Sequence, residues 1–205
     1  MTKRFLKLNL GLVLYAFGIF STLQANLGAA PWDAFHQGLS LKTGLTFGQS
    51  SIIVGLTIVV INVCFKEKIG IGTLLNIVII GLLIDLFYQI NLLPKMTHFI
   101  SGLGLLLLGM VTMAYATYFY VDAALGMGPR DGLMVIMVKL TNKPVGLIRL
   151  FIESTVLLIG YFLGGQIGIG TVVLALGMGP IIQLIFKLLN FQIESVQHDY
   201  IFAKT

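Results

Sequence analysis

Six long apolar runs follow one another along the chain, each close to the length of a helix that crosses a bilayer. A spanning helix needs about 20 predominantly apolar residues. The pattern therefore predicts an all-α integral membrane protein with six transmembrane helices. The predicted spans are Leu8–Ala25, Phe47–Phe65, Thr73–Leu93, Ile100–Val121, Val145–Leu163 and Thr171–Leu189.

Two shorter segments interrupt this pattern, one after the first run and one after the fourth. Pro31–Lys42 and Pro129–Leu140 each contain about a dozen residues, too few to cross a bilayer as a helix. Non-spanning backbone at membrane depth is stable only where protein or a polar cavity surrounds it. The two segments are predicted to be re-entrant or interfacial helices.

The two halves of the chain match when the sequence is shifted by 98 residues. Several residues that fix backbone geometry coincide: Pro31 with Pro129, Asp33 with Asp131, and the Gly-Ile-Gly-Thr motifs at 70–73 and 168–171. The match predicts an N-terminal repeat, a C-terminal repeat and a polar cytoplasmic tail, at 1–98, 99–190 and 191–205. Each repeat then holds three spanning helices and one short helix. Because three is odd, the repeats must be inverted, as in many secondary transporters.

The distribution of Lys and Arg orients the chain, because cytoplasmic loops carry an excess of these residues. With the N-terminus inside, 11 of the 13 lie on the cytoplasmic side and only Lys42 and Lys95 lie outside. Both termini are therefore predicted to be cytoplasmic. If both short segments crossed the membrane, 10 Lys and Arg residues would lie inside and 3 outside. Charge therefore barely separates six spans from eight, and the shortness of the two segments decides for six.

Composition agrees with a membrane environment and narrows the chemistry. Of the 205 residues, 57% are hydrophobic and 10% charged, against about 25% charged in soluble domains. Cytoplasmic loops account for the net charge of +5, so no nucleic-acid partner is expected. A single cysteine, Cys64, leaves no disulfide framework and no cysteine-based metal site. No metal, cofactor or hydrolase motif is present, so we expect no cofactor and no enzymatic activity.

Three stretches resemble one known family. ANLGAAPWDAFHQGLSLKTG, GIGTLLNIVIIGLLIDLF and LGMGPRDGLM are similar to the YczE/YyaS/YitT-type family of bacterial membrane proteins, in particular to its YczE-like branch. The similarity extends to about Lys187. The resemblance implies a multi-pass protein of the bacterial plasma (inner) membrane, and it implies no substrate.

Asp33 and Asp131 occupy the third position of the predicted short helices, where two interpretations are open. Each could cap unsatisfied N–H groups at the positive end of its helix. Alternatively, two half-helices carrying carboxylates could frame a polar cavity for a cation, a proton or an amine. Arg130 could pair with Asp131 or attract an anion, and Trp32 is expected to be an interfacial anchor.

Three further charged residues lie within predicted spans. Asp85 has no basic residue one turn away, and an acid inside a membrane suggests a pathway or a binding site. A nearby helix end, or protonation, could also account for it. Arg149 and Glu153 lie four residues apart, a spacing typical of an ion pair near the cytoplasmic surface. The candidate solute- or ion-binding residues are Asp33, Asp131, Arg130, Asp85, Glu153 and Arg149.

Other motifs have simpler interpretations. The Gly-Ile-Gly-Thr motifs look like phosphate-binding loops, but no Gly-Lys-Ser/Thr follows, so we expect tight turns with Thr73 and Thr171 capping the next helix. His36 is expected on an interfacial helix. The stretch LGMGPII is expected to break or kink the sixth span around Gly177–Pro180.

Together these features favour a small secondary transporter or solute-binding permease. The alternative is a non-transporting membrane protein that assists the assembly or regulation of another protein. The lipid bilayer is the expected partner. The sequence leaves open a small solute or coupling ion, and a second copy of the chain or another membrane protein, as further partners.

Overall fold

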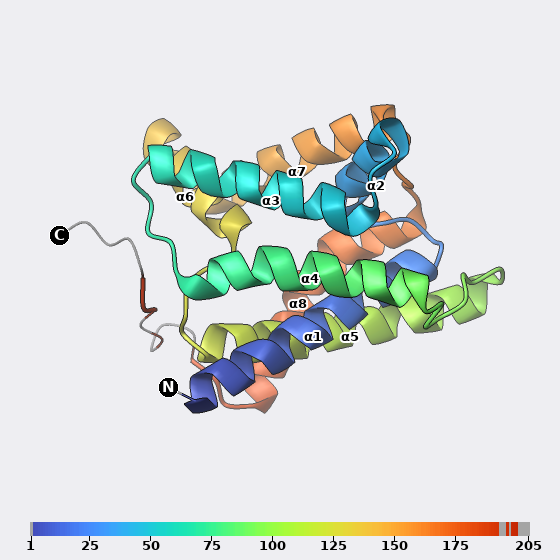
Figure 1. Cartoon of the computed structure of the whole chain (residues 1–205), viewed down its shortest axis with the longest axis horizontal. Coiled ribbons are helices and arrows are strands. Elements are labelled where there is room, and N and C mark those ends of the chain that lie inside the picture. The colour runs from blue at the N-terminus through green and yellow to red at the C-terminus, as the bar shows by residue number, and fades with distance from the viewer. Residues whose placement is uncertain (1, 193–195, 197, 201–205) are drawn as a thin grey trace.

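The computed structural model of the chain describes residues 2–192, 196 and 198–200. Within this part, the regular structure consists of eight α-helices (Figure 1). In chain order they are α1 (Thr2–Gln24), α2 (Pro31–Thr43), α3 (Phe47–Cys64), α4 (Ile71–Gln89), α5 (Phe99–Asp122), α6 (Pro129–Thr141), α7 (Val145–Phe162) and α8 (Ile169–Leu188). The predicted tail, 191–205, lies only partly within the described residues.

Six of these helices, α1, α3, α4, α5, α7 and α8, are long and apolar enough to cross a membrane. The predicted all-α architecture with six long apolar helices is confirmed, although α1 begins at Thr2 rather than at Leu8. The short helices α2 and α6 have 13 residues each, which is about 20 Å of helix against a hydrocarbon core of about 30 Å. We expected a break or a kink around Gly177–Pro180; α8 continues through Pro180 as one helix, so it does not break there.

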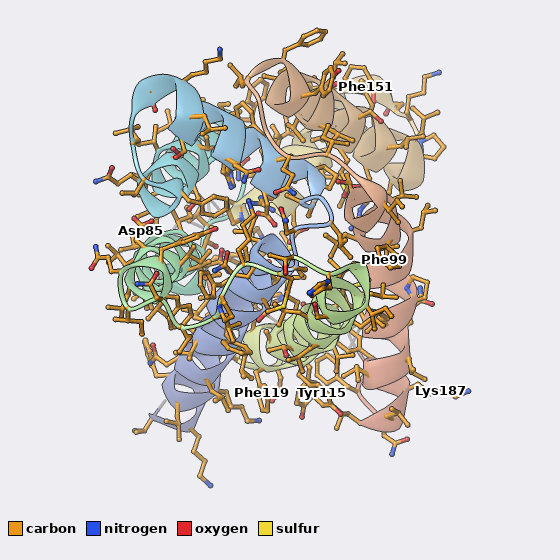
Figure 2. All side chains as sticks on the ribbon, turned by 90° about the vertical axis from the view of Figure 1, so that its right-hand side faces the viewer. Asp85, Phe99, Tyr115, Phe119, Phe151 and Lys187 are labelled. Carbon is orange, nitrogen blue, oxygen red and sulfur yellow. The ribbon has the colours of Figure 1, made fainter. Side chains whose placement is uncertain are left out.

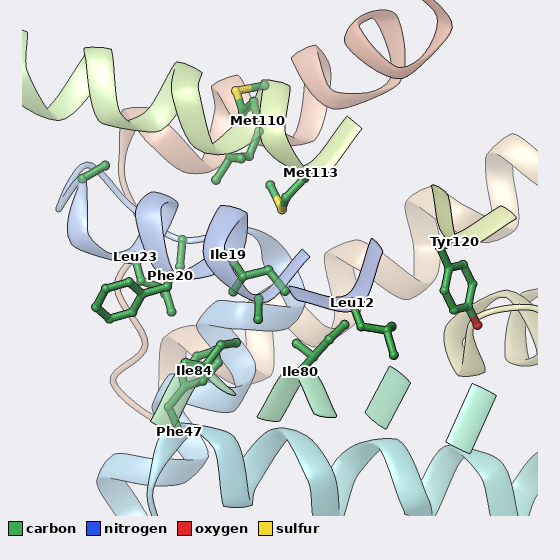
Figure 3. Close-up of a cluster of buried hydrophobic side chains, with 14 of the residues drawn as sticks. Leu12, Ile19, Phe20, Leu23, Phe47, Ile80, Ile84, Met110, Met113 and Tyr120 are labelled. Carbon is green, nitrogen blue, oxygen red and sulfur yellow. The ribbon is translucent and has the colours of Figure 1, made fainter. Parts of the chain in front are cut away.

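The centre of the bundle is a close contact between α1 and α5. At Gly18 and Gly109, a Cβ atom added to either residue would lie within 2.9 Å of the other's carbonyl oxygen. Small residues at such crossings let membrane helices approach closely. Phe20 of α1, Ile84 of α4 and Met110 of α5 are buried in the surrounding core (Figure 3). Packing at the centre therefore joins the first half of the chain to the second.

The short helices are each held by long helices from both halves of the chain. α2 packs against α3 and α7, and α6 packs against α7 and α3. The two short helices lie towards opposite ends of the bundle, and α1 begins and α8 ends at the same end as α6 (Figure 1).

The two halves differ in how closely their last two long helices pack. α3 packs against α4, and a Cβ atom on Gly48 would lie 2.1 Å from the Gly81 carbonyl oxygen. Among the described residues no comparable packing joins α7 to α8. A Cβ atom on Gly146 or Gly179, the equivalent positions in the second half, would meet open space. The bundle is thus closed between α3 and α4 and separated between α7 and α8.

The outward surface of the long helices is apolar. Leu108 on α5, Phe151 on α7 and Leu176 on α8 are exposed, and Figure 2 shows Phe151 at the periphery. Lipid tails are as apolar as Leu side chains, so a bilayer accounts for this exposure.

Candidate functional site

A cavity of about 600 Å³ lies within the bundle and is lined by side chains from all eight helices. Most of its wall is apolar. Its charged lining residues are Asp33, Arg130, Asp131, Arg149 and Glu153. The structure therefore brings all the candidate residues except Asp85 to one cavity. No group of three or more His, Cys, Asp or Glu side chains in the described part of the chain is arranged to hold a metal ion.

The loop before α2 is anchored on the start of α8. The Leu27 carbonyl accepts a hydrogen bond of 2.7 Å from the Gly170 N–H, and the Ala29 N–H donates one of 2.9 Å to the Gln166 carbonyl. Between them Gly28 has φ of 114°, a conformation that side chains disfavour. A Cβ atom there would lie 2.5 Å from the Gly168 nitrogen. These contacts set the direction in which Pro31 and Asp33 enter the bundle.

The loop before α6 is anchored on the start of α4 in the same way. The Leu125 carbonyl accepts a hydrogen bond of 2.8 Å from the Gly72 N–H, and Gly126 has φ of 128°. A Cβ atom on Gly70 would lie 2.2 Å from the Leu125 oxygen. The Thr73 hydroxyl donates to the Met127 carbonyl over 2.5 Å.

The Gly-Ile-Gly-Thr motifs thus have a role that sequence reasoning missed. We expected Thr73 and Thr171 to cap the helices that follow them. No side chain caps α4, whereas the Thr171 hydroxyl accepts a hydrogen bond of 3.2 Å from the Gly168 N–H at the start of α8. The glycines permit a close approach between each motif and the loop that precedes the other half's short helix, and Thr73 helps to hold one such loop. This role could not be inferred from either motif alone, because the partner lies far away in the sequence.

Asp33 lies at the buried end of the cavity. Its residue surface is 4% exposed, and within the described part of the chain its carboxylate takes part in no hydrogen bond. No side chain caps α2, whose N-cap residue is Ala30. The capping interpretation therefore does not describe what this carboxylate does.

His36, one helical turn after Asp33, lines the same end of the cavity. It is 2% exposed, and its Nδ1 atom lies 3.9 Å from the Asp33 Oδ1 atom. That Nδ1 atom is buried without a hydrogen-bond partner. We expected His36 on an interfacial helix. The available sequence signal was its spacing of three residues from Asp33, which places both side chains on one helix face.

Asp131, the equivalent acid of α6, also lines the cavity but is exposed. Unlike Asp33, its carboxylate accepts a hydrogen bond from the backbone N–H of Gly128, the N-cap residue of α6, as the capping interpretation expects. The cavity is consequently accessible on the α6 side and closed on the α2 side.

Trp32 and Arg130 meet between the two short helices. The guanidinium carbon of Arg130 lies 4.8 Å from the centroid of a Trp32 ring, a cation–π distance. Arg130 takes part in none of the ion pairs among the described residues, so the pairing with Asp131 that the sequence left open is not formed. Trp32 is 9% exposed and lines the cavity, so its interpretation as an interfacial anchor is wrong.

Arg149 and Glu153 form the ion pair that their spacing favours. The Arg149 Nε atom lies 2.9 Å from the Glu153 Oε1 atom, and 62% of the Arg149 side chain is exposed. Both residues line the cavity. The pair is therefore a charged part of the cavity wall, more exposed at Arg149 than at Glu153.

Asp85 lies outside the cavity lining, where α4 approaches the start of α3 (Figure 2). Its carboxylate accepts hydrogen bonds from the Thr46 hydroxyl and, over 2.8 Å, from the Gly48 N–H. A carboxylate at the N-terminus of a neighbouring helix satisfies N–H groups that the helix leaves free. Of the alternatives that the sequence left open for Asp85, the structure agrees with an interaction with the end of a nearby helix.

His198 is a further lining residue that sequence reasoning missed. It lies after the last predicted span, and no motif in the tail points to the cavity. The backbone N–H of its neighbour Asp199 donates 2.9 Å to the Ala124 carbonyl at the end of α5. Burial lowers the pKa of His198.

Many lining residues form pairs separated by 98 positions, with one member from each half of the chain. These pairs are Ile19 and Thr117, Trp32 and Arg130, Asp33 and Asp131, His36 and Met134, Ser51 and Arg149, Val54 and Ile152, Gly55 and Glu153, and Ile84 and Ile182. The two halves thus contribute corresponding positions to one wall. Their chemistry differs, because His36 and Gly55 correspond to Met134 and Glu153.

Residues 2–187 match a family described as "Family of unknown function (DUF6198)", and the chain belongs to this family. It is similar to the uncharacterized membrane protein YczE of Bacillus subtilis (strain 168), with 39% identity over 189 residues that cover 89% of this chain and 87% of that protein. The resemblance stated from the three sequence stretches is thereby confirmed. With six helices of spanning length, the chain is a membrane protein.

Two more relatives cover most of the chain. An uncharacterized protein of Haemophilus influenzae (strain ATCC 51907 / DSM 11121 / KW20 / Rd) is 32% identical over 165 residues, which cover 80% of this chain and 75% of that protein. The uncharacterized protein YyaS of Bacillus subtilis (strain 168) is 30% identical over 178 residues, which cover 82% and 85%. No solved structure matches the chain.

Proposed function

We propose that this protein is a small secondary transporter or solute-binding permease of the bacterial plasma membrane, with both termini in the cytoplasm. One observation carries the proposal: Asp33 and Asp131, from equivalent positions of α2 and α6, line a single cavity, and Asp33 is buried there without capping its helix. Carboxylates at membrane depth are costly and by default mark a binding site or an ion pathway. We further propose that the protein is not an enzyme and holds no cofactor.

The proposal includes an inverted repeat, 1–98 against 99–190. Its support is reciprocity, because the loop before each short helix rests on the Gly-Ile-Gly-Thr motif of the other half. The hydrogen bonds from Gly170 to Leu27 and from Gly72 to Leu125 join equivalent positions, at 2.7 and 2.8 Å. Inverted repeats of this kind place the solute site between two broken or short helices near the midplane.

The differences between the halves support alternating access. The cavity is open at Asp131 and closed at Asp33. Gly48 and Gly81 bring α3 and α4 into contact, whereas their equivalents Gly146 and Gly179 have open space. In the proposed cycle, α7 and α8 close together as α3 and α4 separate. The cavity then opens to the other side of the membrane.

A labelling experiment tests transport without knowledge of the solute. In a Cys64→Ser background, Ser51→Cys and Thr117→Cys place single thiols in the cavity wall. A transporter is expected to show labelling of both by a membrane-impermeant thiol reagent, from outside in intact cells and from the cytoplasmic side in inverted vesicles. Lys95→Cys and Lys66→Cys are the controls, expected to react only from outside and only from inside.

Reaction of the cavity thiols from the cytoplasmic side alone would contradict transport. That result would favour the alternative function, a non-transporting partner in the assembly or regulation of another membrane protein. Reaction of both control thiols from the same side would contradict the inverted topology.

A further inference from the structure

We propose that the closed end of the cavity, around Asp33 and His36, is a receptor for the ammonium group of a small organic amine. The inference rests on the proposed function and names its substrate class. It starts from two polar side chains that the fold buries close together, 3.9 Å apart, without a hydrogen bond between them. Asp33 and His36 are 4% and 2% exposed, and the His36 Nδ1 atom has no hydrogen-bond partner.

Such groups are normally satisfied, because an unpaired buried polar atom loses its hydrogen bonds to water without replacement. Both acceptors line the cavity rather than the packed core. They are therefore placed where a ligand can supply the missing donors.

The separation of the two acceptors fits a donor group between them. The Asp33 Oδ1 and His36 Nδ1 atoms are 3.9 Å apart, too far for a direct hydrogen bond. One ammonium nitrogen can lie about 2.9 Å from each atom and direct a separate N–H to each. A neutral imidazole accepts at Nδ1 when its proton is on Nε2.

The charge balance of the cavity calls for one more positive charge. Asp33, Asp131 and Glu153 face Arg130 and Arg149 across it, and Glu153 is already paired with Arg149 at 2.9 Å. Two carboxylates then remain against one guanidinium, when the histidines are counted as neutral. An anionic solute would increase this imbalance, whereas a monovalent cation removes it.

Aromatic rings surround the same position. The His36 ring centroid lies 5.8 Å from that of Phe47 and 6.4 Å from that of Trp32. Trp32 already holds one cation, the Arg130 guanidinium, against its ring. Aromatic faces attract ammonium groups by the same quadrupole interaction.

The rest of the cavity indicates an organic cation rather than a bare metal ion. Its volume of about 600 Å³ exceeds what one ion needs, and apolar side chains such as Ile58, Ile77 and Ile80 form its wall. A hydrocarbon body can pack there while its ammonium group reaches Asp33.

Trp32 provides a direct measurement, because it is the only tryptophan of the chain and lies at the site. We suggest titrating the purified full-length protein, in detergent micelles at pH 7 and constant ionic strength, with n-butylammonium chloride. An alkylammonium group is charged at this pH, as a Lys side chain is. The comparison titrations use 1-butanol as a neutral analogue, butyrate as an anion, and NaCl in place of KCl.

The expected result is a saturable change in Trp32 emission with n-butylammonium and none with 1-butanol or butyrate. An equal response to 1-butanol would show an apolar pocket without charge recognition and would overturn the proposal. A response to NaCl without one to n-butylammonium would assign the site to an inorganic ion, and would overturn it as well. So would the absence of any saturable response.

Variants distinguish amine binding at this site from nonspecific effects of the amine on the protein. Asp33→Asn should raise the apparent Kd by about tenfold or more, since hydrogen bonds to charged groups are among the stronger ones. His36→Leu, which removes the second acceptor but keeps the charge, should raise it severalfold. The matched control is Asp122→Asn, the same substitution at a carboxylate outside the cavity that pairs with Lys7, and it should bind like the original protein.

Unchanged binding in Asp33→Asn would refute the assignment. If Asp33→Asn does not elute as a folded protein, His36→Leu decides in its place. The thiol-labelling experiment uses no ligand, so two-sided labelling without amine binding would refute only the substrate class. One-sided labelling with amine binding would refute only transport.

Discussion

Arg130 lies against the ring of Trp32, with its guanidinium carbon 4.8 Å from the ring centroid, and the two residues occupy equivalent positions 98 residues apart. The second residue of α2 therefore contacts the second residue of α6. This contact joins the two short helices across the cavity, and it is possible because the two halves have different side chains at one repeat position.

Arg130→Gln should weaken this link. Loss of the cation–π interaction is expected to lower the free energy of unfolding by about 1 kcal/mol and to change the emission of Trp32. The control is Arg149→Gln, which removes a cavity arginine that does not contact Trp32. Emission that is identical in both variants and in the original protein would show that the contact does not persist in solution.

Asp33→Asn and Asp85→Asn should differ in their effect on stability, and only Asp85→Asn should lower it. Asp85 accepts hydrogen bonds from the Thr46 hydroxyl and the Gly48 N–H, so Asp85→Asn should lower the free energy of unfolding by about 1–2 kcal/mol. Asp33 is buried without a hydrogen bond, so Asp33→Asn should leave stability unchanged or raise it. Thermal unfolding of both variants in the same detergent is the measurement. The reverse order would mean that Asp33 is structural.

Local sequence patterns predicted the helices. The residues whose roles the sequence did not predict are those whose contacts lie far away along the chain. Apolar run length predicted six long helices, and the Pro-led segments predicted helices that begin at Pro31 and Pro129. The sequence could not decide between the alternatives for Asp85, because its partner, the start of α3, lies 37 residues earlier in the sequence. His198 reaches the cavity from the tail, where no periodicity points inward.

Sequence comparison of the halves also has a physical limit. It identifies equivalent positions, such as Asp33 and Asp131, but equivalence does not determine exposure. One of these acids is buried and the other exposed, because the packing around α2 and α6 differs. Only tertiary structure distinguishes two copies of one motif in this way.

Gly28→Ala and Gly126→Ala should each destabilise the protein. Both glycines have a positive φ, of 114° and 128°, and a Cβ atom would lie 2.5 Å from Gly168 or 2.7 Å from Gly70. A loss of about 2 kcal/mol or more is expected from strain and displaced backbone. Gly104→Ala in α5 is the control, because a Cβ atom there meets nothing within 4 Å. A similar melting temperature for all three variants would contradict the observed loop anchoring.

Glu153→Gln should have a small effect on stability. The pair with Arg149 is largely exposed on the arginine side, and exposed i,i+4 pairs contribute about 0.3–0.5 kcal/mol. Chemical denaturation in micelles would measure the difference. If the free energy of unfolding fell by several times this amount, the ion pair would have to be shielded from solvent, and Glu153 would be a structural residue.

Gly179→Leu should block the proposed exchange of contacts without unfolding the protein. In this conformation a Cβ atom on Gly179 meets open space, so the variant should retain its melting temperature, and Leu is a better helix former than Gly. If α7 and α8 close in the other conformation as α3 and α4 do here, the added side chain prevents that closure. Ser51→Cys should then lose its labelling from outside and keep its labelling from the cytoplasmic side.

The matched variant is Gly81→Leu, at the equivalent position of α4. Its Cβ atom would lie 2.6 Å from Ile52 and 2.9 Å from the Gly48 carbonyl oxygen, so it opposes the contact that exists in this conformation. It should lower the melting temperature or shift the protein towards the outward-accessible form, with stronger labelling of Ser51→Cys from outside. Unchanged two-sided labelling in Gly179→Leu would contradict closure at Gly146 and Gly179, because a Leu side chain cannot fit where two helix backbones touch.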